Sequence, residues 1–372
     1  MIQDRGQKAQ VIRYILAKRW FPQLEVVVLP EMKISKANKA LTDIDVLALL
    51  PDEFDGFRSL LIDCRTTKGE SPISRALWQR GLMDQLRATR GICILKRDNI
   101  EDDHRYAGAK LGVLLLTETE FDDFARTTGG ADLGPKSSIA NLDLWEEYLA
   151  LQEKFPALKG LVDLAFSGHW MCQTPAEACR KSVALLRSHR GELDPSKPPH
   201  IFLVGDSCSL FMESVARITA DIFASYLKPA QRDKLSQALL FLLYGGKEAY
   251  QYRERILKLV KQPKKGANLL SATEPTKVPE LSPPEWNQFV ELIRNCLESP
   301  TEAPKAPLIL RELSFGALSG ASRHDFGKTL SKESPHGTKL AIFGIEYLCK
   351  AAMLPSEFAE HFVRILMDLP NP

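Results

Sequence analysis

Several features that mark common protein classes are missing from this chain of 372 residues. No apolar run reaches the roughly 18 residues that a membrane-spanning helix needs, so no membrane span is expected. The opening residues MIQDRGQKAQ also lack the apolar core of a signal peptide. We therefore expect a protein that neither enters a membrane nor carries a secretory leader.

Cysteine pairs at metal-binding spacing are absent as well. The seven cysteines stand singly and none forms a CxxC pair, which argues against a zinc site. They are Cys64, Cys93, Cys172, Cys179, Cys208, Cys296 and Cys349. Scattered cysteines fit a reducing compartment, so a cytoplasmic location is expected. The charge excess is small: a net charge of +2 permits nucleic-acid binding without requiring it.

Helical and strand patterns alternate before residue 130. Helices are expected over 6–21, 71–89, 102–112 and 117–127, and strands over 24–32, 41–50, 57–68, 91–97 and 113–117. Pro22 should end the first helix, Ser71 and Pro72 should begin the second, and Thr117 or Thr119 should cap the last. This order predicts an α/β domain over 1–130, with a mixed central sheet flanked by helices.

Beyond residue 130 the pattern becomes mostly α-helical. Apolar residues recur every three or four positions over 139–155, 158–170, 175–189, 206–227, 229–244 and 246–262. The run HIFLVG at 200–205 is interpreted as a lone strand or the lead-in to a helix, and Asp206 or Ser207 as a helix cap. We expect a helical domain over 137–262 and a helical C-terminal region over 285–372.

Two acidic residues interrupt neighbouring apolar strands. Asp45 lies within 41–50, and Asp63 lies within 57–68, followed two residues later by Arg65. A buried carboxylate is unfavourable unless its charge is compensated. If the strands pair, both carboxylates reach one edge of the sheet, where Mg²⁺ or Mn²⁺ would relieve their repulsion. Because side chains alternate along a strand, Arg65 would point the same way as Asp63, toward a phosphate.

The layout of residues 5–126 resembles the PD-(D/E)XK nuclease superfamily, which has the restriction-endonuclease-like fold. In that family one strand supplies Asp and the next supplies (Asp/Glu)-x-Lys. The resemblance implies that Asp45 and Asp63 hold the metal ion, that Arg65 is the third catalytic residue, and that DNA is the substrate. Two positions depart from the family: Arg65 replaces Lys, and Gln10 of GQKAQ stands where Glu is frequent. Both departures should weaken metal binding and hydrolysis.

Other residues are candidates to support this site. Lys68 could replace the absent lysine if the strand has ended or bulged by then, and Lys8, Lys33 and Lys96 are further donors. Gln79, on the helix that follows, could support the site or reach DNA. The alternative is that Gln79 is a solvated helix position.

Arg75, Arg80 and Lys96 are candidates for contacts with nucleic-acid phosphates. The alternative for the two arginines is a solvated helix surface. The acidic residues have a similar alternative, in which Asp45 lies on the surface of an edge strand and Asp63 forms a weak ion pair with Arg65.

Three functions follow as hypotheses. The first is a metal-dependent nuclease that hydrolyses phosphodiester bonds of DNA, in bacterial genome defence or repair. The second is a catalytically degenerate nuclease-fold protein that serves as a DNA-binding or scaffold subunit of a larger complex, with the helical region binding a protein partner. The third is a helical interaction protein whose N-terminal domain is unrelated to nucleases.

Overall fold

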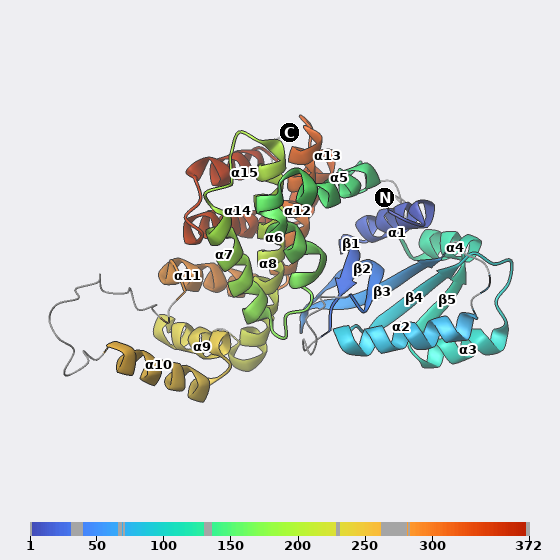
Figure 1. Ribbon diagram of the computed structural model, residues 1–372, viewed down its shortest axis with the longest axis horizontal. Helices are drawn as coiled ribbons and strands as arrows, with labels where there is room; N and C mark the ends of the chain where they lie inside the picture. The colour runs from blue at the N-terminus through green and yellow to red at the C-terminus, as the bar shows by residue number, and fades with distance from the viewer. Residues whose placement is uncertain are drawn as a thin grey trace.

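The computed structural model describes residues 2–30, 40–65, 69, 71–129, 136–227, 231–261, 281 and 283–369. A region with a five-stranded sheet is followed by a region built from helices (Figure 1). The elements of the first region follow the order α-β-β-β-α-β-α-β-α, which confirms the order predicted from the sequence. The mixed sheet and the change to helices near residue 130 are confirmed with it.

The sheet has its strands in sequence order. They are β1 (Phe21–Val28), β2 (Thr42–Asp52), β3 (Gly56–Arg65), β4 (Arg90–Leu95) and β5 (Val113–Thr117). β1, β2 and β3 pair antiparallel, whereas β3, β4 and β5 pair parallel. The strand β3 therefore joins the hairpin half of the sheet to the half in which helices connect the strands.

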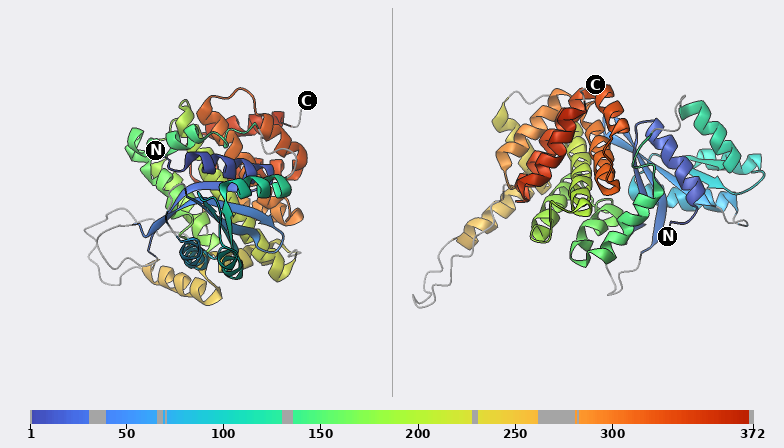
Figure 2. Two further views of the ribbon diagram at one scale, coloured as in Figure 1. Left: turned by 90° about the vertical axis from the view of Figure 1, so that its right-hand side faces the viewer. Right: turned by 90° about the horizontal axis from the view of Figure 1, so that it is seen from above.

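Four helices cover the two faces of the sheet. They are α1 (Arg5–Ala17), α2 (Pro72–Leu86), α3 (Asp102–Lys110) and α4 (Glu118–Gly129). α1 and α4 lie on one face, and α2 and α3 lie on the other (Figures 1 and 2). Side chains that leave the sheet on opposite faces therefore meet different helices.

The predicted starts of α2 and α4 are correct, and the predicted end of α1 is wrong. Pro72 is the first residue of α2 after Ser71, although the Ser71 side chain makes no capping hydrogen bond. Thr117 and Glu120 form a capping box: Thr117 Oγ1 accepts the Glu120 N–H at 3.3 Å, and Glu120 accepts the Thr117 N–H at 2.8 Å. Pro22 does not end α1. The helix stops at Ala17, and Pro22 lies in β1, an edge strand that tolerates proline.

The helical region surrounds one long buried helix, α8 (Pro198–Tyr226). The other helices are α5 (Leu142–Lys154), α6 (Lys159–Asp163), α7 (Pro175–His189), α9 (Arg232–Tyr244), α10 (Lys247–Lys261), α11 (Trp286–Glu298), α12 (Ala306–Ser319), α13 (Asp325–Glu333), α14 (Pro335–Ala351) and α15 (Ser356–Asp368). Within the described parts of the chain, no helix has the length and apolar character needed to cross a membrane.

The interpretation of 200–209 is corrected by α8. The run HIFLVG lies inside this helix and is neither a strand nor a lead-in. Asp206 and Ser207 are also internal, so they are not caps. Asp206 instead pairs with Arg311 of α12 at 2.8 Å, and both side chains are fully buried. Arg311 donates in turn to the Pro22 carbonyl at 2.6 Å, which ties the helical region to β1.

Candidate functional site

β2 and β3 pair as expected and bring the two acidic residues near each other. Val46 of β2 pairs with Ile62 of β3. Asp45 precedes Val46 and Asp63 follows Ile62, so in this antiparallel pair the two acids lie side by side. Both residues are buried, with exposed fractions of 9% and 3%. The Cys64 N–H donates to Asp45 Oδ2 at 2.7 Å, so the Asp45 side chain takes up a backbone donor of β3.

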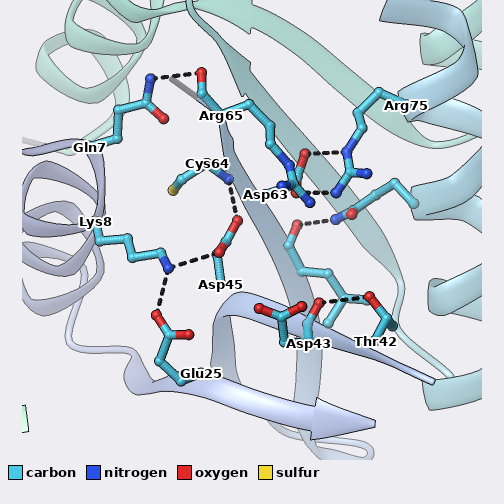
Figure 3. Close-up of polar contacts among 12 residues, drawn as sticks. Gln7, Lys8, Glu25, Thr42, Asp43, Asp45, Asp63, Cys64, Arg65 and Arg75 are labelled. Carbon is cyan, nitrogen blue, oxygen red and sulfur yellow. Dashed lines mark hydrogen bonds and ion pairs between the residues drawn. The ribbon is translucent and has the colours of Figure 1, made fainter. Parts of the chain in front are cut away.

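Asp45 has a basic partner on α1. The Lys8 ammonium lies 2.8 Å from Asp45 Oδ1 and also pairs with Glu25 of β1 (Figure 3). Burial raises the pKa of the Asp45 carboxyl, while Lys8 lowers it and the nearby charge of Asp63 adds a smaller increase. Burial alone would lower the pKa of Lys8, but the two carboxylates outweigh it and raise that pKa. Glu25 is a site residue that the sequence analysis did not identify.

Asp63 has two basic partners. The Arg75 guanidinium of α2 binds it in a bidentate manner, at 2.7 Å from Nε to Oδ2 and 2.5 Å from Nη2 to Oδ1. Arg65 Nε adds a contact of 3.2 Å with Oδ1. Arg75 also stacks on the Trp78 ring, with 3.6 Å between the guanidinium carbon and the ring centroid. The sequence predicts that Arg75 contacts nucleic acid. In the structure its side chain is buried, with 8% exposed, and its guanidinium binds Asp63 instead.

The two carboxylates turn toward different partners (Figure 3). Asp45 points toward Lys8 of α1, and Asp63 points toward Arg75 of α2. α1 and α2 lie on opposite faces of the sheet. The mutual repulsion of two buried acids is therefore relieved by two separate ion pairs that the chain supplies itself.

This donor set does not fit Mg²⁺ or Mn²⁺. All four carboxylate oxygens of Asp45 and Asp63 already accept hydrogen bonds from protein groups. The negative charges of Glu25, Asp45 and Asp63 are matched by three basic side chains, those of Lys8, Arg65 and Arg75. Within the described ranges, no group of three or more His, Cys, Asp or Glu residues is arranged to hold a metal ion.

The predicted glutamines occupy different positions. Gln79 of α2 is 1% exposed and donates to the Leu61 carbonyl of β3 at 3.0 Å, so it is not a solvated helix position. Gln10 is exposed on α1. Its neighbour Gln7 faces the sheet instead, donating to the Arg65 carbonyl at 3.2 Å and to Glu118. Gln7 lies about one helical turn before Gln10, and only the docking of α1 distinguishes the two.

The predicted basic residues do not gather at one point. Lys96 is exposed, and its backbone N–H donates to the Arg65 carbonyl at 2.9 Å. Lys96 and Gln10 line the same surface recess of about 650 Å³ at the ends of the parallel strands. Arg80 is partly exposed on α2 and pairs with Asp84. Lys68 and Lys33 lie outside the described residues.

Comparison with known proteins gives no relative: no family model matches the chain, and no match was found among the curated proteins or the solved structures. The resemblance to the PD-(D/E)XK superfamily is therefore carried by the element order and by Asp45, Asp63 and Arg65 alone.

Proposed function

We propose that residues 5–129 form a nuclease-like module that binds DNA and has lost most or all hydrolytic activity. The observation that carries this proposal is the pairing of both motif acids with buried bases, Lys8 for Asp45 and Arg75 for Asp63. Ion pairs of this kind stabilise a domain without a bound metal. In this proposal the helical region contributes the surface for a protein partner in a larger assembly.

DNA binding is supported by the basic groups at the end of β3 and β4. Two guanidiniums meet one carboxylate at Asp63, whereas one ammonium is shared by two carboxylates at Lys8, so the positive charge is concentrated on the Asp63 side of a cluster that is neutral as a whole. Arg65 is the more exposed of the two arginines, with 31% of its side chain accessible. The exposed Lys96 follows β4 directly beside it. A guanidinium and an ammonium at one sheet edge suit contacts to backbone phosphates.

A metal-dependent nuclease is the second candidate. The observation that favours it is the Lys8 ammonium beside Asp45, because it supplies the lysine that the (Asp/Glu)-x-Lys motif lacks here. This function requires Lys8 and Arg75 to release the two carboxylates before either could hold an ion. A role in genome defence or repair belongs to both candidates and rests on analogy with the fold alone.

Binding is tested by fluorescence anisotropy with labelled duplex DNA, single-stranded DNA and RNA at several salt concentrations. We expect DNA binding that weakens with salt. The double variant Arg65→Gln/Lys96→Gln should bind roughly tenfold more weakly and show a shallower salt dependence, because two phosphate contacts are lost. Lys332→Gln/Lys339→Gln, two exposed positions of the helical region, is the matched control. Failure of the wild type to bind any of the three at low salt contradicts the proposal.

Hydrolysis is tested by incubating the protein with plasmid and with single-stranded DNA in the presence of Mg²⁺ or Mn²⁺. The first candidate predicts no cutting above the level of Asp63→Ala. Metal-dependent cutting that disappears in Asp63→Ala would favour the second. Arg65→Lys restores the family motif, so activity that appears only in this variant would identify the arginine as the cause of the loss.

A further inference from the structure

The helical region contains a small apolar pocket of about 250 Å³. It is bounded by α7, the end of α9, residues 283–284, α11 and α14. Its wall includes Arg180, Val183, Arg187, Tyr244, Phe289 and Tyr347. None of them belongs to the site between α1, β2, β3 and α2.

One face of α7 brings two arginines to this pocket. Residues three or four positions apart lie on the same side of a helix. This spacing places four residues of α7 on the side that faces the pocket: Arg180, Val183, Ala184 and Arg187. Both arginines are half-buried. The sequence of α7 therefore combines a short apolar surface with a positive charge at each end.

Neither arginine has an acidic partner among the described residues. The Arg180 guanidinium lies 5.4 Å from the centroid of the Tyr244 ring, and Arg187 Nη2 contacts the Met353 sulfur at 3.3 Å. No Asp or Glu lines the pocket. Guanidiniums in partly buried positions usually pair with carboxylates, because the fork of N–H donors matches two carboxylate oxygens. Two such groups beside one apolar pocket provide a site for an anion.

The remaining residues of the pocket wall are uncharged, and the nearby Glu285, whose charge contributes to the raised pKa of Tyr347, pairs with Lys350 at 3.1 Å. The Tyr244 hydroxyl donates to the Leu281 carbonyl, and the Tyr347 hydroxyl donates to the Pro284 carbonyl at 3.1 Å. Burial raises the pKa of the Tyr347 hydroxyl and of the Cys179 thiol well above their usual values, so both groups stay neutral. Together with Phe289, they form an uncharged wall that suits a hydrocarbon or an aromatic ring.

We propose that this pocket binds a small organic acid, with its apolar body between the tyrosine rings and Phe289 and its carboxylate on the guanidinium at one end of the pocket, Arg180 or Arg187. The volume lies below the roughly 300–1,000 Å³ of pockets for drug-sized molecules, so the ligand has a single ring or a short chain. This inference does not depend on the function proposed for residues 5–129.

The test is calorimetric titration of the whole protein with phenylacetate and with hexanoate. The uncharged phenylacetamide and hexanamide, and inorganic phosphate, are titrated alongside them. We expect saturable binding of at least one acid, with its amide at least tenfold weaker and phosphate weaker still. The variant Arg180→Gln/Arg187→Gln should lose at least tenfold in affinity for the acid. Arg190→Gln, at the exposed end of α7 and outside the pocket, should bind like the wild type.

The proposal would be overturned by no binding of either acid, by an amide that binds as tightly as its acid, or by an unchanged affinity in the double arginine variant. Phosphate that binds as tightly as the acids would also overturn it, because the apolar wall would then play no part. Val183→Phe should fill the pocket and abolish binding. If circular dichroism shows that Val183→Phe does not fold, the affinity of the double arginine variant still tests the proposal.

Discussion

The Lys8 ammonium lies 2.8 Å from a carboxylate oxygen of Asp45, and the two side chains are 1% and 10% exposed. An aspartate buried in an apolar strand needs a compensating positive charge, and this ion pair provides it. The compensating charge comes from the helix that opens the domain. Two buried charges remain stable together because each satisfies the other, and removing one leaves its partner uncompensated.

Replacing this lysine should therefore destabilise the protein strongly. Lys8→Met leaves Asp45 and Glu25 without their shared base and should lower the free energy of unfolding by about 3–5 kcal/mol. Urea denaturation of both proteins at neutral pH measures the change. Lys18→Met, a more exposed position just after α1, should have a much smaller effect. A loss below about 1 kcal/mol in Lys8→Met would show that the pair contributes little.

Local patterns were sufficient to predict the N-terminal region. Strand and helix periodicities are written in consecutive residues, so the order of nine elements and the pairing of β2 with β3 could be expected from them. The capping box formed by Thr117 and Glu120 is equally local. These features depend on residues that are close in the sequence.

Which basic residue pairs with Asp45 and which with Asp63 could not be predicted in the same way. Lys8 was one of several candidate lysines, and only the docking of α1 brings it to Asp45. The pairing of Arg75 with Asp63 likewise depends on where α2 crosses β3. The sequence of α8 is misleading because a helix that is buried on most sides has no polar face, so its apolar run resembles a strand.

The buried pair of Asp206 and Arg311 gives a second prediction. Arg311→Met should lower the free energy of unfolding by about 3–5 kcal/mol, because Asp206 loses its base and the Pro22 carbonyl loses a donor. Asp206→Leu/Arg311→Met removes both charges and should recover part of this loss. Chemical denaturation of the two single variants and the double variant measures the coupling between the residues. A double variant whose loss equals the sum of the two single losses would contradict an energetic link.

Glu312 of α12 gives a prediction about pH. It accepts hydrogen bonds from Ser137 Oγ at 2.5 Å and from the Ser138 N–H at 2.9 Å, and so holds the entry to the helical region. Burial raises the pKa of this carboxyl from 4.5 to about 7, although these donors oppose the shift. A pKa raised in the folded state adds stability that is complete below pH 4.5 and is lost as the pH rises through 7.

The contribution of Glu312 should fall by about 3 kcal/mol across this window, from the difference between the two pKa values. Glu312→Gln cannot titrate, so its free energy of unfolding should decline less than that of the wild type between about pH 4.5 and pH 8. Urea denaturation at the two pH values gives the comparison. Parallel changes in the two proteins would show that Glu312 does not titrate in this range.

Gly205 marks a close approach of α8 to α12 and α15. A Cβ atom at this position would lie closer than 3.0 Å to Ser314 of α12 and to Phe362 of α15. Gly205→Ala should therefore cost at least about 1–3 kcal/mol of overpacking strain, despite the higher helix propensity of alanine. Gly81 lies inside α2, where an added Cβ would meet no atom within 4 Å, so Gly81→Ala should stabilise the protein by up to about 1 kcal/mol. Thermal denaturation should shift in opposite directions for the two variants, and a gain in stability for Gly205→Ala would show that α8 can move away from α12.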